Sequence, residues 1–124
     1  MKFTSKPRWT LIIGLLGASG VALGAIAAHA LAEPAATSVE RASTYQILHA
    51  ITLLVLCEAS GRLVTIARWT MLAGIIGFSG AIYAKYLLHL PALGALAPIG
   101  GSLLILSWLL LAVSWIGHHS TRPD

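Results

Sequence analysis

Four long apolar blocks, separated by polar or helix-breaking residues, dominate the pattern along the chain. They cover about residues 9–31, 44–60, 69–90 and 99–117. A helix needs about 20 residues to cross ~30 Å of hydrocarbon, because it rises about 1.5 Å per residue. Each block is near that length, so the pattern predicts an all-α integral membrane four-helix bundle that forms one domain over residues 1–124.

Proline and charged residues set the predicted ends of these helices. Glu33-Pro34 ends the first block, because proline restricts the residue before it and cannot continue the backbone hydrogen bonds. Residues 37–43 predict a polar loop or a short interfacial helix. Pro91 follows the third block, and Pro98 suits the first turn of the fourth helix.

Composition supports a membrane protein and excludes other classes. Hydrophobic residues make up 57% of the chain and charged residues 10%, whereas soluble domains carry about 25% charged residues. The net charge of +4 comes from basic residues that form no patch, so we expect no nucleic-acid partner. Cys57 is the only cysteine, which excludes an internal disulfide.

The positions of Lys and Arg predict the orientation. Six of the eight fall on one side of a four-span arrangement: Lys2, Lys6, Arg8, Arg62, Arg68 and Arg122. Arg41 and Lys85 fall on the other side. Because cytoplasmic loops are enriched in Lys and Arg, this split predicts that both termini lie in the cytoplasm.

One alternative concerns residues 1–32, which resemble a cleavable signal peptide. They combine a basic start, an apolar stretch and Ala30-Leu31-Ala32 before Glu33. The apolar stretch is longer than the 7–15 residues of a usual signal core, which favours a retained first helix.

A repeat with an offset of 60 residues also favours a retained first helix. Residues 8–20 are identical to residues 68–80 at seven of thirteen positions, beginning with Arg-Trp-Thr in both. The same register aligns His29 with His89. The repeat predicts two helical hairpins of the same orientation, related by an axis along the membrane normal.

Small residues and polar residues mark two kinds of candidate position. Glycines that would let helix backbones approach closely are Gly17, Gly20, Gly24, Gly77, Gly80, Gly100 and Gly101. Helical rise places a set of polar side chains in the outer half of the bundle, away from the cytoplasm. This candidate polar cluster comprises His29, Tyr45, Gln46, His49, Ser79, Tyr83, Lys85 and His89.

Several short motifs resemble those of one protein family. Residues 23–31 resemble its glycine-alanine-histidine motif, and residues 45–50 resemble its tyrosine-glutamine-x-x-histidine-alanine motif. Residues 78–83, and residues 98–101 followed by Trp108, resemble the remaining two. The chain is therefore similar to domain-of-unknown-function family 423, which includes YgdD-like inner-membrane proteins and is similar to transmembrane protein 256. The resemblance implies a small multi-pass protein of the bacterial inner membrane with no established activity.

The candidate chemistry favours a non-enzymatic protein without a cofactor. No acidic pair, Ser-His-Asp set or metal-ligand spacing is present in the sequence. The leading interpretation is a helix bundle that packs against other membrane proteins or against itself. A second is an outer-face binding module for a quinone or lipid-like molecule, centred on His49, Tyr45, Gln46, His29 and Tyr83. A small transporter, or haem ligation by His29 and His89, is less favoured.

Overall fold

A computed structural model describes residues 7–119, and every regular element within them is helical. The elements, in chain order, are α1 (Pro7–Ala30), α2 (Ala35–Leu56), α3 (Arg62–Ile75), η1 (Ile76–Gly80), α4 (Ala81–Leu87), η2 (Pro91–Leu96) and α5 (Ala97–His119). The π-helical η1 joins α3 and α4 into one continuous rod, and η2 is a 3₁₀ helix. The described chain therefore folds as four long helical rods.

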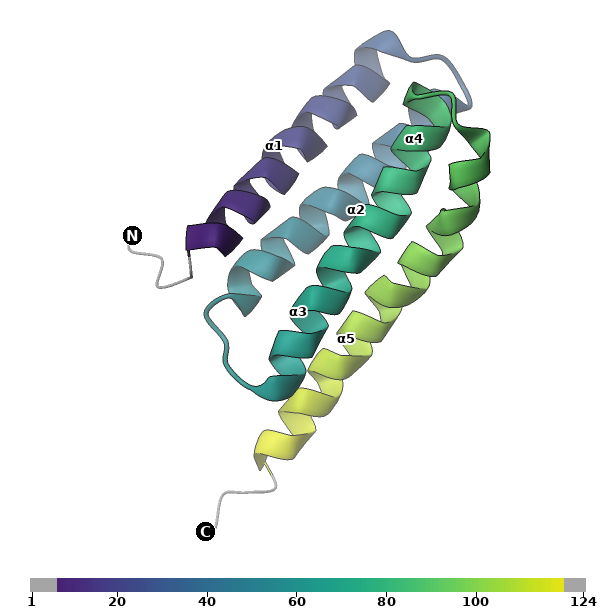
Figure 1. Cartoon of the computed structure of the whole chain (residues 1–124). Coiled ribbons are helices and arrows are strands. Elements are labelled where there is room, and N and C mark those ends of the chain that lie inside the picture. The colour runs from purple at the N-terminus through teal and green to yellow at the C-terminus, as the bar shows by residue number, and fades with distance from the viewer. Residues whose placement is uncertain (1–6, 120–124) are drawn as a thin grey trace.

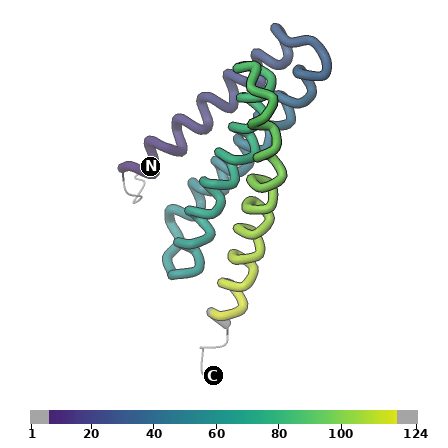
Figure 2. Tube along the Cα trace, turned by 45° about the vertical axis from the view of Figure 1, so that its right-hand side comes forward, coloured from purple at the N-terminus to yellow at the C-terminus, as the bar shows by residue number. Residues whose placement is uncertain are grey.

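Neighbouring rods run in opposite directions and form two hairpins. The most extensive packing is between α1 and α2 and between α3 and α5, and α2 then faces α3, η1 and α4 of the other hairpin. The start of α1 and the end of α5 lie toward the end of the bundle where α2 joins α3 (Figure 1). Figure 2 shows that α1 is inclined to the other rods.

Three of the helical segments in the described chain are long and apolar enough to cross a membrane. They are Pro7–Ala30, Arg62–Leu87 and Pro91–Gly117. The sequence predicted four such segments, and α2 does not reach the same apolar character. Its central position explains why, because its buried residues follow helical spacing from Val39 to Leu56 and are covered by the other rods.

The second helix is displaced from its predicted position. It begins at Ala35 instead of residue 44, so residues 37–43, predicted as a polar loop or a short interfacial helix, form the first turns of α2. Glu33 stabilises this start: its carboxylate accepts hydrogen bonds from the Thr37 hydroxyl at 2.6 Å and the Thr37 N–H at 3.4 Å. A carboxylate at a helix N-terminus satisfies free N–H groups and favours the helix dipole.

The other helix ends differ less from prediction. The third rod begins at Arg62 instead of residue 69 and ends at Leu87, and η2 fills the segment after Pro91. The first and fourth helices agree with prediction to within two residues at each end.

A close backbone crossing joins η1 to α5. A Cβ atom added to Gly77 would lie 3.0 Å from the Gly100 Cα, and one added to Gly100 would overlap the backbone of Gly77 and Phe78. Only glycine fits at Gly100, and this approach sets how the second hairpin is packed.

Arg68 connects three rods at the end where α2 joins α3. Its Nη2 donates hydrogen bonds to the carbonyl oxygen of Leu56, the last residue of α2, at 2.8 Å and to that of Ala59, just past the helix, at 3.1 Å. The guanidinium carbon lies 5.5 Å from the centre of the Trp9 ring, which itself lies 4.9 Å from the Trp69 ring. A cation here satisfies free carbonyl groups at a helix C-terminus.

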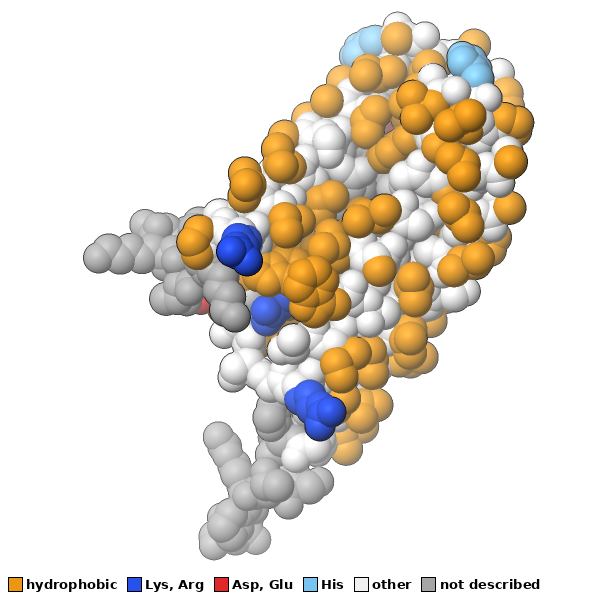
Figure 3. Space-filling view, in the orientation of Figure 1, with side chains coloured by type: hydrophobic (Ala, Val, Ile, Leu, Met, Phe, Trp, Pro, Cys, Tyr) orange, Lys and Arg blue, Asp and Glu red, His pale blue; other side chains and the backbone are white. Residues whose placement is uncertain are grey.

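Charged and histidine side chains separate along the bundle on the face shown in Figure 3. Lys and Arg gather toward the end where α1 begins, and histidines gather at the opposite end. Both His29 and His89 are exposed. Lys2, Lys6 and Arg122 of the predicted basic set lie outside the described residues.

Candidate functional site: a polar stripe on the central helix

Polar side chains of α2 recur every three residues on its buried face. Ser43, Gln46 and His49 are all buried, so each must find a hydrogen-bond partner on another rod or on its own backbone. The Ser43 hydroxyl donates to the Gly20 carbonyl at 2.7 Å. This bond ties α2 to α1 at the first of the three levels.

Gln46 bridges three rods. Its Nε2 donates to the Leu16 carbonyl at 2.7 Å and to the Ser19 hydroxyl at 2.8 Å, both on α1. Its Oε1 accepts a hydrogen bond of 2.8 Å from the Tyr83 hydroxyl on α4. Ser79, also buried, donates to the Ala42 carbonyl of α2 at 2.8 Å. Gln46 therefore uses both its donor and its acceptor atoms within the chain.

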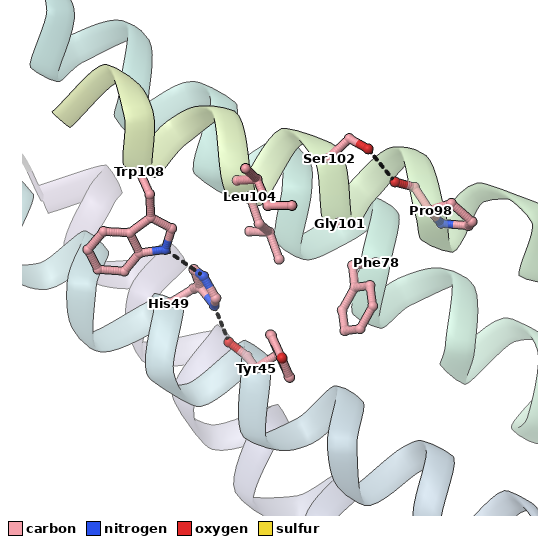
Figure 4. A pocket seen from close by; sticks show the side chains of 9 residues that line it. Tyr45, His49, Phe78, Pro98, Gly101, Ser102, Leu104 and Trp108 are labelled. Carbon is pink, nitrogen blue, oxygen red and sulfur yellow. Dashed lines mark hydrogen bonds between the residues drawn. The ribbon is translucent and has the colours of Figure 1, made fainter. Parts of the chain in front are cut away.

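His49 is held between its own helix and α5. Its Nδ1 lies 2.6 Å from the Tyr45 carbonyl, and its Nε2 lies 3.1 Å from the Trp108 Nε1 (Figure 4). The indole N–H can only donate, so the His49 Nε2 accepts and Nδ1–H donates to Tyr45. This pair of bonds requires the neutral ring, and it leaves neither ring nitrogen unpaired.

The structure brings five of the eight predicted polar residues together and separates three. Tyr45, Gln46, His49, Ser79 and Tyr83 lie along the interface of α2 with the other hairpin or on its rim. His29 and His89 are exposed at the end of the bundle. Lys85 is also exposed, and its Nζ lies 4.9 Å from the centre of the Tyr86 ring.

Some of the predicted packing glycines lie at a close contact between helices, and others do not. A Cβ atom at Gly20 or Gly24 would lie 2.7 Å from an α2 side chain, so both adjoin α2 closely. A Cβ at Gly17 would meet nothing within 4 Å, and those at Gly80 and Gly101 would make only ordinary contacts. Gly74, which was not among the predicted glycines, lies against Leu104 of α5.

Sequence reasoning also missed several partners within the network. Ser43 and Ser19 could have been found from their helical spacing, since Ser43 is three residues before Gln46. Trp108 entered only through the family motif, because nothing in the sequence fixes the rotation of α5 against α2. Among residues 7–117, no group of three or more His, Cys, Asp or Glu side chains could hold a metal ion.

A cavity of about 450 Å³ lies beside His49, between α2, η1 and α5. Aromatic side chains from all three elements line it, together with small residues of α5 (Figure 4). Its lining includes Tyr45, His49, Phe78, Gly101, Ser102 and Trp108. The polar stripe itself is closed by hydrogen bonds, so this cavity is the accessible space next to it.

Fold and apolar surface together define a small helical membrane protein. The chain belongs to the family described as "Protein of unknown function (DUF423)", which matches residues 23–101. It is 38% identical over 112 residues to a UPF0382 membrane protein of Staphylococcus aureus, covering 84% of this chain and 92% of the relative. It is 33% identical over 114 residues to UPF0382 membrane protein YwdK of Bacillus subtilis, covering 84% and 93%. No solved structure matches the chain.

Proposed function

We propose that this protein is a non-enzymatic, multi-pass subunit of the bacterial inner membrane that packs against other membrane proteins or against itself. The observation that carries the proposal is the closed polar stripe of α2. Ser43, Gln46 and His49 direct their polar atoms to partners inside the chain. Such bonds hold helices together in lipid and leave no unpaired catalytic group along the stripe.

The outward surface supports the same proposal. Large apolar side chains stand exposed along α1 and α5, including Leu11, Val21, Ile105 and Trp115. In a bilayer these faces meet lipid or other apolar helices. The opening between the inclined α1 and α3, lined by residues such as Leu15 and Leu72, adds a surface of this kind.

The proposed orientation has both termini in the cytoplasm and all four rods crossing the membrane as two parallel hairpins. The Lys and Arg bias in Figure 3 supports this orientation. The contact between the Trp9 and Trp69 rings supports the parallel hairpins, because these residues are equivalent in the repeat. Reporter fusions would test it: a reporter active only in the cytoplasm should be active after Asp124, and a reporter active only outside should be active between α1 and α2.

Crosslinking in native membranes followed by purification in mild detergent tests the packing role. We expect a defined larger species that contains this chain with itself or with another membrane protein. A strictly monomeric chain under both treatments would contradict the proposal.

Replacement of His49 gives a second, independent test. His49→Leu removes the acceptor of the Trp108 N–H and should lower the free energy of unfolding by about 1–3 kcal/mol. We expect the yield of the larger species to fall together with stability. A variant of unchanged stability would show that the polar stripe does not hold the bundle together.

A further inference from the structure

The cavity beside His49 has the shape of a slot with aromatic walls. On one side the Tyr45 ring lies 5.2 Å from the Phe78 ring and, nearly parallel, 6.1 Å from the His49 ring. The Trp108 ring forms the end of the slot, 6.1 Å from the His49 ring (Figure 4). These rings contact one another, so together they form an aromatic wall on which a flat ring can pack by stacked or edge-on contact.

The α5 side of the slot includes two small residues, Gly101 and Ser102. A Cβ atom added at Gly101 would make ordinary contact with the Phe78 ring at 3.7 Å, so a larger side chain at this position would enter the slot. The Ser102 hydroxyl donates back to the Pro98 carbonyl at 2.8 Å and does not cross the slot. The volume of about 450 Å³ lies within the 300–1,000 Å³ that ligand pockets usually have.

One hydrogen-bond donor in the slot is unused. Among the described residues the Tyr45 hydroxyl has no hydrogen-bond partner, and the side chain is 45% exposed. The nearby Trp108 N–H and His49 Nε2 already bond to each other. A free phenol within an otherwise apolar slot suits a ligand that carries a carbonyl oxygen.

The backbone beside the slot is also unusual. Phe78 belongs to η1, the π-helical turn inside the third rod, and π-helical turns within α-helices frequently occur at functional sites. The turn sets Phe78 against the cavity while the next residue, Ser79, bonds to α2. The irregular turn thus provides one wall of the slot and one contact of the bundle.

The apolar side chains of Ile105 and Trp108 stand exposed beside the slot, which suits a ligand that arrives from the bilayer. We propose that this slot binds a lipid-soluble molecule whose flat ring carries a carbonyl group, the chemistry of a prenylquinone head. The ring packs against Tyr45, Phe78 and Trp108, and the Tyr45 hydroxyl donates to the carbonyl. This binding site is additional to the packing role and does not depend on it.

Native mass spectrometry of the full chain in lipid nanodiscs, with decylubiquinone as the probe, tests the site. We expect a saturable one-to-one adduct. Gly101→Leu fills the slot and should weaken binding at least tenfold, whereas Gly14→Leu, a matched change where an added Cβ meets nothing within 4 Å, should leave binding unchanged. Tyr45→Phe should weaken binding about three- to tenfold, as expected for one neutral hydrogen bond.

The controls separate a ring site from other outcomes. Circular dichroism and thermal unfolding establish that each variant is folded, and Ser102→Leu fills the same slot from an exposed position if Gly101→Leu does not fold. Absence of an adduct, or equal binding by folded wild type and slot-filling variants, would overturn the proposal. Equal competition by 1-decanol would overturn it too, because the slot would then recognise a chain instead of a ring.

Discussion

At the residue scale, the Gln46 amide is the most connected polar group of the described chain. It accepts from Tyr83 on α4 and donates to two groups on α1, so one side chain fixes the relative height of three rods. Each bond contributes only modestly to the free energy of unfolding, because the polar groups of the unfolded chain in a membrane also find hydrogen-bond partners. The three bonds together matter more for specifying one arrangement than for stability.

We expect a measurable coupling between Tyr83 and Gln46. Tyr83→Phe and Gln46→Leu should each destabilise the bundle, and the double variant should lose less than the sum, with a coupling energy of about 0.6–1.7 kcal/mol. Unfolding by SDS titration in mild micelles gives the four free energies of the cycle. Strict additivity would mean that the bond of 2.8 Å between them contributes nothing.

His89 occupies a backbone conformation that favours glycine. Its φ is +55°, in the left-handed region at the end of α4, whereas its repeat equivalent His29 lies within α1. His89→Gly should therefore stabilise the bundle by about 1 kcal/mol, because an L side chain is strained there. The matched change His29→Gly should destabilise a regular helix by about 0.5–1 kcal/mol. If both variants changed the free energy of unfolding in SDS in the same direction, the left-handed conformation assigned to His89 would be contradicted.

At the element scale, the crossing of η1 and α5 depends on two glycines. Gly100→Ala should cost about 1–3 kcal/mol, because the added methyl group overlaps the Gly77 and Phe78 backbone and forces the helices apart. Gly14→Ala is the control, since its methyl group meets nothing within 4 Å, and it should be neutral or stabilising by up to about 1 kcal/mol. The same unfolding assay measures both, and a neutral Gly100→Ala would show that the crossing is looser than described.

The helical elements themselves were largely predictable from the sequence. Apolar blocks of about 20 residues fix the number of rods, and Pro91 and Pro98 fix the start of α5 within two residues. The start of α2 was not predictable from hydropathy, because residues 37–43 are polar and their helix depends on the cap from Glu33. The π-helical turn at η1 was also unpredictable, since it arises from how the third rod packs against α5 and α2.

The candidate site was predictable only in part, because it too depends on how the helices pack against one another. Helical spacing on α2 placed Tyr45, Gln46 and His49 near one another, and depth along the helix placed Tyr83 at a similar level. The depth of a residue along its helix does not determine which way it faces around the helix axis, however. The exposed His29 was therefore grouped with buried residues. Trp108 was overlooked as the partner of His49 because it lies on the helix whose rotation the sequence does not specify.

At the scale of the whole molecule, Arg68 holds the two hairpins together at one end. Arg68→Leu removes two hydrogen bonds to carbonyl groups at and just past the end of α2 and the contact with Trp9, and should cost about 1.5–3 kcal/mol. Arg68→Lys keeps the charge but not the planar fork, so we expect an intermediate loss.

The exposed Arg62 supplies the control for this change. Arg62→Leu should alter the free energy of unfolding by no more than about 0.5 kcal/mol. Unfolding in mild micelles, with Trp emission reporting the Trp9–Trp69 contact, separates the two positions. Equal effects at Arg62 and Arg68 would mean that loss of positive charge, and not the connection between rods, is responsible.

The central, less apolar α2 has a consequence for how the chain enters the bilayer during synthesis. In the proposed four-span arrangement α2 carries Gln46 and His49 into the hydrocarbon, where an isolated helix would leave the Gln46 amide and the His49 Nε2 without partners. The partners of Gln46 on α1 are made first, but Tyr83 on α4 and Trp108 on α5 emerge from the ribosome only later. The insertion machinery must therefore retain the first hairpin beside it until the second has been translated, and shortening the chain before α4 should leave the nascent α2 exposed to quality-control proteolysis.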